Sequence, residues 1–240
     1  MRHAISKLAT YHCVATQRAR ERLEKMGEAA ERIHLTGAPG LDGLHELAAA
    51  SHARTLTDLG LPPSADFVLV LFHPVVQQAG DAAQQTRNLA QALKQLGLPV
   101  LWLEPNADAG AREILAALDG AQLPQGSRRI THLARPRFCA AMRHCVVMAG
   151  NSSSGIIEAA SFGTPVVNIG ARQHMREHGA NVVDVATDAA AIAQALLAQR
   201  NHGRFSGDNP WGDGHAGERI AQLLARLPLA RAVLEKTNSY

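Results

Sequence analysis

The segment GNSSSGIIEAASFGTP, residues 150–165, carries three consecutive hydroxyl groups and a glycine at the start of a predicted helix, with a carboxylate one turn later. Unpaired backbone N–H groups and the partial positive charge of a helix N-terminus favour a phosphate. The serines at 152–154 can donate to phosphate oxygens, and Gly155 lets the backbone approach. Glu158 can accept from the two hydroxyls of a ribose, as acidic residues do at nucleotide sites. These residues predict a nucleotide diphosphate site.

The position of this segment fits that prediction. In open parallel sheets, ligands sit beyond the C-terminal ends of strands, where a tight turn leads into a helix, and the segment follows the predicted strand VVMAG. A helix cap is the alternative, with one serine as the N-cap and Glu158 as the acidic part of the cap. The cap leaves the second and third serines unexplained, so both interpretations stay open.

Polar side chains follow two other predicted strands. His73 ends DFVLVLFH, at the same sheet edge, where it can hydrogen-bond a leaving diphosphate and stabilise its growing charge. The alternative is a strand-end histidine held by the backbone. Asn106 and Asp108 follow the strand LWLE and can line a polar pocket, although Asn and Asp are also turn formers.

The loop after the strand VVNI is rich in charged residues. Arg172 and Arg176 suit a diphosphate through forked hydrogen bonds, or else belong to a solvated loop. His174, Glu177 and His178 match the H-x-x-E-H spacing of zinc peptidases, which requires a stable helix to bring both histidines to one face. This loop lies between two strands and is bounded by glycines, so we expect no metal site.

The order of the elements predicts the fold class. Short β-branched runs alternate with longer helical stretches, which is typical of βαβ units, and the runs are apolar nearly throughout, as in strands covered on both faces. We expect an α/β fold with a Rossmann-like, doubly wound parallel sheet. The predicted strands are DFVLVLFH, PVLWLEPN, RRITHLA, VVMAG, PVVNIG and NVVDV, and the predicted helices are DAAQQTRNLAQALKQLG, AREILAALDGA, PRFCAAMRHC and the one that the serine segment opens.

The two ends of the chain have a different pattern. Residues 1–40 predict a helix, a strand, a basic amphipathic helix and a strand, and two strands cannot close a sheet alone. A turn, GAPGLDG, and a helical linker lead into the main domain, which we expect to span 41–205. Residues 206–240 complete a polar, glycine-rich loop and form a last helix, AGERIAQLLARLPLA.

Composition argues against several classes of function. The formal net charge is +3, from 24 Lys and Arg against 21 Asp and Glu with no block of like charge, so we expect no nucleic-acid partner and no membrane partner. The first residues, MRHAISKLATYH, lack the apolar core of a signal peptide, and no run is long enough to span a membrane. Cys13, Cys139 and Cys145 form no CxxC pair, which fits reduced thiols and a cytoplasmic location.

Together these stretches resemble the UDP-N-acetylglucosamine 2-epimerase family, in particular its hydrolysing branch, which includes the epimerase half of the bifunctional epimerase/N-acetylmannosamine kinase. The matching stretches cover nearly the whole chain in family order: RHAISKLATYH, the HP of LFHPVV, PNADAG, GNSSSGIIEAASFGTPVVNIGARQ, GANVVDV and GDGHAGERI. The non-hydrolysing branch typically has a glycine pair where this chain has Ser153 and Ser154, which favours the hydrolysing branch.

The resemblance implies two Rossmann-like domains in a GT-B-like architecture, with UDP held mainly by the C-terminal one. This chain then supplies 1–40 as a remnant of the N-terminal domain, 41–205 as the UDP-binding domain, and 206–240 as a loop and helix that pack back toward the N-terminal domain. The implied UDP-binding residues are Ser153, Ser154, Gly155, Glu158 and Arg172. His73 would face the leaving phosphate, with Asn106 and Asp108 near the cleft, and no cofactor or metal is implied.

The chemistry implied by the resemblance is anti-elimination of UDP to a glycal, followed by hydration with inversion at C2. The hydrolysing branch converts UDP-N-acetylglucosamine to UDP and free N-acetylmannosamine. Proton transfer at C2 needs a positioned acceptor and donor, which in the family are carboxylates of a domain preceding the RHAISK-like segment, and no residue here matches them. We therefore expect this chain alone to bind UDP weakly, to turn over little, and to form homo-oligomers through apolar surface meant for that domain.

Three alternatives stay open. A GT-B glycosyltransferase fragment would use a similar helix N-terminus and glutamate on UDP, although the RHAISK and PNADAG stretches argue against it. A non-catalytic UDP-sugar-binding module is compatible with the missing acid and base. Within the epimerases, a diacetamido-trideoxy sugar would need only small changes in the pocket, so the C4 substituent of the sugar is not determined.

Overall fold

The computed structural model describes residues 2–228, 230, 235 and 236, and these form two compact units. Unit 1 combines the chain up to Leu44 with the chain from Asn209 onward, and unit 2 is the continuous segment His45–Asp208. The assignment of 1–40 to a preceding domain and the docking of 206–240 against it stay predictions. Residues 229, 231–234 and 237–240 of that last segment lie outside the described residues.

Unit 2 is built on a parallel sheet of six strands in the order β5-β4-β3-β6-β7-β8. The chain runs outward from β3 through β4 to β5, returns to β6 beside β3, and continues to β8 at the other edge. The predicted α/β fold with a doubly wound parallel sheet is confirmed, and the winding changes direction between β3 and β6. The strands are β3 Val68–Leu71, β4 Val100–Leu103, β5 Arg128–Ile130, β6 Val147–Gly150, β7 Val166–Ile169 and β8 Val182–Val185.

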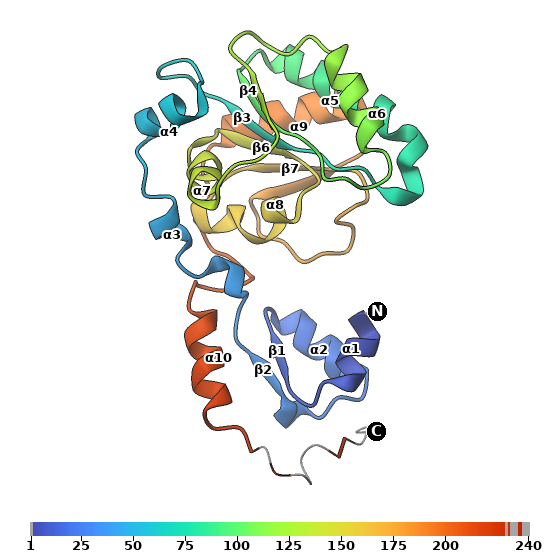
Figure 1. Cartoon of the computed structure of the whole chain (residues 1–240), viewed down its shortest axis with the longest axis vertical. Coiled ribbons are helices and arrows are strands. Elements are labelled where there is room, and N and C mark those ends of the chain that lie inside the picture. Colours follow the sequence, from blue (N-terminus) through green and yellow to red (C-terminus); the bar gives the residue numbers. More distant parts are fainter. Residues whose placement is uncertain (1, 229, 231–234, 237–240) are drawn as a thin grey trace. The chain divides into compact units, whose positions relative to one another are not determined.

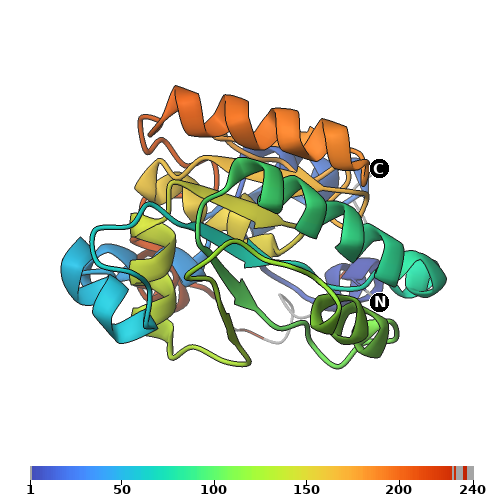
Figure 2. The ribbon, with the colours of Figure 1, turned by 90° about the horizontal axis from the view of Figure 1, so that it is seen from above.

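Helices cover both faces of this sheet (Figure 1). α5 (Ala82–Leu96), α6 (Ala111–Asp119) and α9 (Ala189–His202) pack together over one face, as Figure 2 shows. The other face carries α7 (Arg135–His144), which packs with α4 (His52–Leu59), and α8 (Ser153–Ile157). Shorter elements are α3 Leu44–Leu47, η3 Val76–Asp81 and η4 Ala159–Phe162. Among the described helices, none is long and apolar enough to cross a membrane.

The core explains why the strands are apolar on both sides. Val70, Phe72 and Trp102 are at most 1% exposed and lie in one apolar cluster with Leu93 of α5 and Ile192 of α9. Burying a side chain of this kind contributes about 1.5–3 kcal/mol. The sheet is therefore a rigid frame, and the loops at its carboxyl edge start from fixed points.

Gly150 lets the last residues of β6 approach β3 closely. Its φ is +133°, and a Cβ at this position would lie 2.0 Å from the carbonyl oxygen of Leu71. Only glycine fits such a conformation at such a contact. The next residue, Asn151, donates its N–H to the same Leu71 oxygen at 3.0 Å, so it begins directly beside the end of β3.

Unit 1 contains two parallel strands, β1 His12–Val14 and β2 Ile33–Leu35. Its helices are α1 Arg2–Leu8, α2 Gln17–Lys25 and α10 Ala216–Leu224, with short turns η1 Ala30–Arg32 and η2 Pro39–Leu41. Large apolar side chains of this unit are exposed, namely Ile5 by 58%, Leu8 by 83%, Leu35 by 49% and Leu224 by 60%. The expected homo-oligomer stays a prediction, which these side chains support.

A buried carboxylate joins the two ends of unit 1. The Glu28 side chain is 1% exposed and forms ion pairs with Lys7 at 3.1 Å, His12 at 3.0 Å and Lys236 at 2.5 Å. Burial alone would raise the pKa of Glu28, but hydrogen bonds from Lys236, Lys7 and His12 outweigh it and lower the pKa to about 2. The carboxylate stays ionised because its partners satisfy it.

Replacing Glu28 by Gln should lower the free energy of unfolding by about 3 kcal/mol at neutral pH, because Lys7 and the mostly buried Lys236 lose their counter-charge. The pKa of Glu28 lies below its ordinary value of about 4.5. Its stabilisation is therefore present above about pH 4.5 and is lost as the pH falls toward 2. Urea unfolding between about pH 7 and pH 3 should show this loss in the wild type and not in Glu28→Gln.

The control variant is Glu24→Gln, which removes an ion pair with Arg20 in which both side chains are more than a third exposed. This change should lower the free energy of unfolding by less than about 1 kcal/mol. If Glu28→Gln is as stable as Glu24→Gln, the buried cluster does not hold unit 1 together.

Candidate functional site

The candidate site lies at the carboxyl ends of β3 and β6, where the winding of the sheet changes direction. Doubly wound sheets bind ligands in the crevice outside the strand ends at this point. His73 follows β3 and Asn151 follows β6, while Asn106 and Arg172 follow the neighbouring strands β4 and β7. The sheet thus brings four loops to one edge.

Asn151 fixes the loop that carries His73. Its Oδ1 accepts from the backbone N–H of His73 at 2.8 Å, and its Nδ2 donates to the His73 carbonyl at 2.8 Å. A primary amide can donate and accept at the same time, and Asn151 is only 2% exposed. Asn151 was not among the predicted site residues; the signal for it is its place directly after a strand and before the serines.

The backbone of Asn151 also holds the loop after β7. Its carbonyl accepts from Nη1 of Arg172 at 3.0 Å and from Nε2 of the buried Gln173 at 2.8 Å. This contact uses one of the N–H groups of the half-buried guanidinium. The rest of the Arg172 fork can bind an anion.

His73 is held in one tautomer. The backbone N–H of Asn106 donates to its Nδ1 at 3.2 Å, so Nδ1 carries the lone pair and the proton of the neutral ring lies on Nε2. Burial and the charge of Arg172 together lower the pKa of His73 to about 4, although the carboxylate of Asp108 opposes this shift. At neutral pH the ring is an uncharged N–H donor near a guanidinium, which suits an oxyanion.

Asn106 and Asp108 form a turn of their own. Nδ2 of Asn106 donates to Oδ2 of Asp108 at 2.5 Å, and both residues are exposed. This local contact is what the turn-former alternative expects, and that alternative stays open. The contact between the Asn106 N–H and His73 nevertheless attaches this turn to the site, and their role in a polar pocket stays a prediction.

The serine segment begins a helix, as predicted, but a short one. Ser152 is the N-cap, with its Oγ 3.4 Å from the N–H of Ser154 and 2.9 Å from the Ser154 hydroxyl. α8 ends after five residues, and the 3-10 turn η4 follows Glu158. The chain tightens before β7: Gly163 is left-handed, and the N–H of Thr164 donates to the Ala159 carbonyl at 3.0 Å.

The short helix changes how a phosphate would be held. Five residues give a small dipole, so individual N–H and O–H donors carry most of the attraction. Within the described chain, the hydroxyl and the backbone N–H of Ser153 have no hydrogen-bond partner. Gly155 packs against β7, where a Cβ would lie 3.1 Å from Val166, so it keeps α8 close to the sheet.

Glu158 is held by a residue that sequence reasoning missed. Its side chain is 13% exposed, and its Oε1 accepts from Nη2 of Arg135 at 2.5 Å. Ser152 caps α8 as the alternative proposed, whereas the described partner of Glu158 is Arg135. Arg135 begins α7, 23 residues before Glu158. No local spacing indicates this pair, because it depends on how α7 and α8 lie on the sheet.

The H-x-x-E-H spacing does not form a helix. Residues 171–175 form a bend and turns, and Nδ1 of His178 lies 3.0 Å from the Gly179 carbonyl. In the described part of the chain, no three His, Cys, Asp or Glu side chains are grouped to hold a metal ion. The requirement of that motif for one helix face is therefore not met.

Sequence comparison relates the chain to nucleotide-sugar epimerases. Residues 1–225 match a family model described as UDP-N-acetylglucosamine 2-epimerase. The chain is 40% identical to the UDP-N,N'-diacetylbacillosamine 2-epimerase (hydrolyzing) of Legionella pneumophila, over 100% of this chain and 64% of that relative. It is 31% identical to the UDP-N-acetylglucosamine 2-epimerase of Neisseria meningitidis, over 93% of this chain and 60% of that relative. It thus spans less than two thirds of the length of either relative.

A solved structure shares the fold. The crystal structure of the Neisseria meningitidis UDP-N-acetylglucosamine 2-epimerase, bound to UDP-N-acetylglucosamine, superposes with a TM-score of 0.72 at 14% identity. The match covers 94% of this chain and 64% of that chain. At this identity the likeness concerns the fold alone.

The protonation of His73 can be measured directly. Proton–nitrogen NMR of the imidazole should show a neutral ring with its proton on Nε2 down to about pH 5, because the pKa is about 4. Arg172→Gln should raise that pKa by removing a positive charge, and Asp108→Asn should lower it by removing a negative one. A ring that gains its proton near pH 6.5, or a pKa that moves in the same direction in both variants, would contradict this account.

Proposed function

The chain belongs to the UDP-N-acetylglucosamine 2-epimerase family, and from that premise we propose that it holds and activates the UDP group in a hydrolysing UDP-sugar 2-epimerase reaction. The observation that carries the proposal is the neutral His73 ring, with its proton on Nε2, at the same sheet edge as the unpaired donors of Ser153. The 40% identity to a hydrolysing relative supports that branch.

We assign the diphosphate to the start of α8. The hydroxyls of Ser153 and Ser154 donate to its oxygens, together with the backbone N–H of Ser153. Arg172 contributes positive charge through the N–H groups that Asn151 does not use. Glu158 accepts from the ribose hydroxyls with the carboxylate oxygen that Arg135 leaves open.

In the proposed reaction, a base removes the proton from C2 of the sugar, and the electrons of that bond form a double bond to C1. The C1–O bond breaks, and UDP leaves with its electron pair. The Nε2–H of His73 donates to the departing phosphate oxygen, and donors placed in this way contribute roughly 100-fold to the rate. Water then adds its oxygen to C1, and C2 gains a proton on the opposite face, which gives UDP and the free 2-epimer.

The acid and base at C2 stay predicted to be carboxylates of the domain that precedes these residues in the family. Asn106 and Asp108 stay candidates for the sugar cleft. UDP-N-acetylglucosamine is the substrate expected from the sequence. The 40% identical relative, a UDP-N,N'-diacetylbacillosamine 2-epimerase, makes a UDP-diacetamido sugar the second candidate.

The cytoplasmic location also belongs to this proposal. Cys13 is exposed, Cys139 and Cys145 are buried, and all three are free thiols. Unpaired cysteines are typical of a reducing compartment, where nearly all cysteines are kept reduced.

Calorimetric titration with UDP tests the assigned site. Ser153→Ala should weaken UDP binding about tenfold, because one donor to a charged phosphate is lost. The control is Ser51→Ala, which removes another N-cap serine, on α4, whose Oγ accepts from the N–H of Arg54 at 3.3 Å. This control should cost about 1 kcal/mol of stability and leave UDP binding unchanged. Equal UDP affinity of the two variants would rule out the placement, and no binding at millimolar UDP would rule out the function.

Turnover is tested by mixing the chain with the separately expressed part of the Legionella relative that it does not span. NMR would follow the release of UDP and free sugar from UDP-N-acetylglucosamine and from UDP-N,N'-diacetylbacillosamine. His73→Ala should lower kcat about 100-fold, whereas His73→Gln keeps a neutral N–H donor and part of the activity. UDP binding without turnover in any mixture would favour the non-catalytic module, and sugar transfer to an acceptor would favour a glycosyltransferase.

A further inference from the structure

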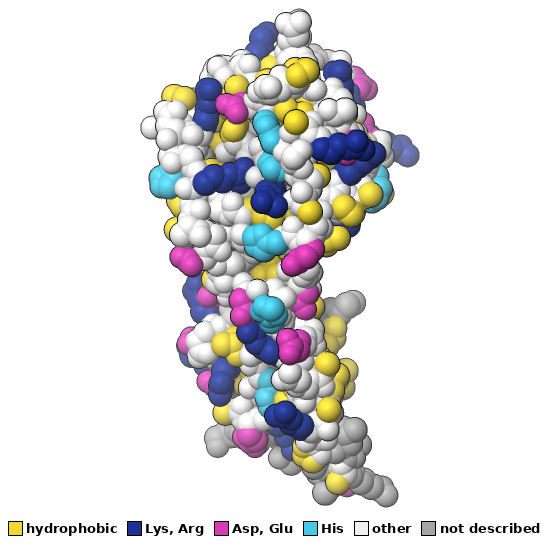
Figure 3. Space-filling model, turned by 90° about the vertical axis from the view of Figure 1, so that its left-hand side faces the viewer, with side chains coloured by type: hydrophobic (Ala, Val, Ile, Leu, Met, Phe, Trp, Pro, Cys, Tyr) yellow, Lys and Arg dark blue, Asp and Glu magenta, His cyan; other side chains and the backbone are white. Residues whose placement is uncertain are grey.

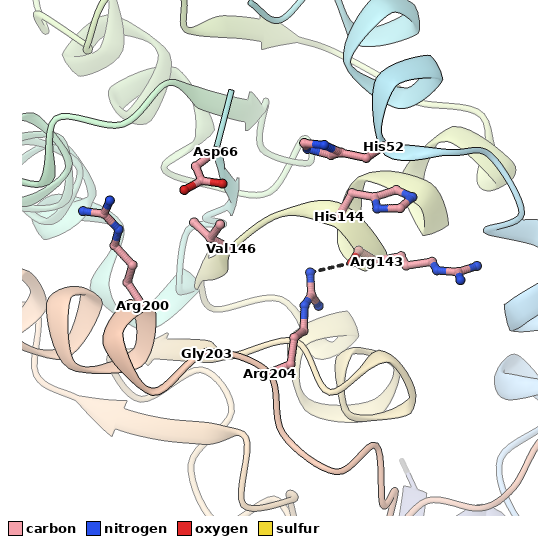
Figure 4. A pocket seen from close by; sticks show the side chains of 8 residues that line it. All are labelled: His52, Asp66, Arg143, His144, Val146, Arg200, Gly203 and Arg204. Atoms are coloured by element: carbon pink, nitrogen blue, oxygen red, sulfur yellow. Dashed lines mark hydrogen bonds between the residues drawn. The ribbon is translucent and has the colours of Figure 1, made fainter. Parts of the chain in front are cut away.

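A cavity of unit 2 opens at the opposite end of the strands from the candidate site. Its volume is about 410 Å³, and it is lined by Asp66, which precedes β3, and Val146, which precedes β6. Its other lining residues come from the start of α4 and the ends of α7 and α9: His52, Arg143, His144, Arg200, Gly203 and Arg204. Figure 4 shows these side chains around the cavity, and Figure 3 shows arginine and histidine side chains gathered on the side of unit 2 where α4 and α7 lie.

The cavity is strongly basic. It is lined by the guanidinium groups of Arg143, Arg200 and Arg204 and by one carboxylate, that of Asp66. Three positive charges against one negative leave a net charge of +2. Among the described residues, none of these arginines forms an ion pair with a carboxylate. Arginine stays charged at any physiological pH, so this positive charge lacks a counter-charge from the protein.

Arg204 is fixed in place by neutral acceptors. Its Nη2 donates to the carbonyls of Arg143 at 2.5 Å and Cys145 at 2.6 Å, and its Nη1 donates to the hydroxyl of Thr164. These contacts orient the guanidinium without cancelling its charge. Burial lowers the pKa of Arg204, and the nearby charge of Arg143 lowers it as well. An anion would relieve this repulsion.

The two histidines contribute donors to the cavity. Nε2 of His144 lies 2.8 Å from the Ala50 carbonyl and donates to it. Burial lowers the pKa of His144, and the charges of His52, Arg143 and Arg204 act in the same direction. The ring of His52 lies 5.5 Å from that of His144 and has no hydrogen-bond partner among the described residues. His52 can therefore donate to a ligand.

The attraction of arginines to the carboxyl ends of helices explains only part of the cluster of arginines at this cavity. Arginines in the last turns of α7 and α9 are favourable for those helices, and Arg204 satisfies carbonyls at the end of α7. The Arg143 guanidinium points away from Arg204 in Figure 4 and donates to the Ala48 carbonyl at 3.1 Å. Arg200, by contrast, donates to no described residue. Helix capping therefore does not explain why Arg200 lines a cavity.

We propose that this cavity binds a small oxyanion, with the size and charge of inorganic phosphate or of the phosphate group of a small metabolite. Arg200 and Arg204 supply the charge, and His52 supplies a further donor. Arg200, which has no described partner, can give a tetrahedral oxyanion paired N–H bonds. Arg204 contributes mainly its charge, because both of its Nη atoms already donate to carbonyls and to the Thr164 hydroxyl. The cavity lies at the opposite end of the strands from the start of α8, so the oxyanion and UDP would occupy separate sites.

Titration with inorganic phosphate at constant ionic strength, followed by calorimetry, tests this site. The wild-type chain should bind phosphate with a Kd on the order of 1 mM. Arg200→Gln should weaken binding about tenfold, because a charge-assisted hydrogen bond is lost. Arg200 is exposed and makes no described side-chain contact, so this variant keeps the fold intact.

Two controls separate this site from others. Arg112→Gln removes an exposed arginine on α6 that does not line the cavity, and it should leave phosphate binding unchanged. Ser153→Ala should also leave it unchanged, since Ser153 belongs to the proposed UDP site. If Ser153→Ala weakens phosphate binding and Arg200→Gln does not, the anion binds at α8 and the proposal fails. It also fails if binding is not saturable below about 50 mM phosphate.

Discussion

Two hydrogen bonds between the Asn151 amide and the backbone of His73 join loops that are 78 residues apart in the sequence. The same residue accepts from Arg172 and Gln173 through its carbonyl, so the loops after β3, β6 and β7 share one buried anchor. A carboxylate at this position could not donate to the His73 carbonyl, and an unpaired buried polar group costs about 1–3 kcal/mol. Gly150 makes the arrangement possible because no side chain separates β6 from the end of β3.

The candidate site, whose loops Asn151 holds in place, uses neutral donors and paired charges. His73 is uncharged at neutral pH because burial and the charge of Arg172 lower its pKa. Glu158 forms an ion pair with Arg135. The segment from Ser152 to Thr164 is held at both ends: by the cap of α8 at one, and at the other by Arg204, which donates to the Thr164 hydroxyl. The candidate site and the basic cavity of unit 2 thus lie at opposite ends of one short stretch of chain.

Much of this fold could be predicted from residue patterns, because the strands are buried on both faces and read as continuous apolar runs. All six strands of the large sheet were predicted, and so was the place of His73 at the same edge of the sheet as the serine segment. α9 was missed, because its alanine-rich run has no clear apolar stripe. The interruption of α8 at Glu158 was missed because it depends on how little chain separates Phe162 from β7.

The side-chain contacts that position the site could not be predicted, because they depend on the tertiary structure. Asn151 and Arg135 are ordinary polar residues in the sequence, and their partners His73 and Glu158 are brought to them by the order of the strands and the packing of α7. Sequence patterns indicate which residues sit at an edge of a sheet. They do not indicate which neighbour each side chain will bond.

Unit 1 combines two distant parts of the chain, and this determines which unit can fold first during synthesis. Glu28 meets Lys236, and the hydroxyl of Tyr11 donates to the carbonyl of Pro228, across separations of more than 200 residues. Unit 2 is a continuous segment with its own core, so it can fold while the ribosome is still adding residues. Unit 1 must wait for the last part of the chain to emerge, and until then the Glu28 carboxylate relies on water and on its N-terminal partners for solvation.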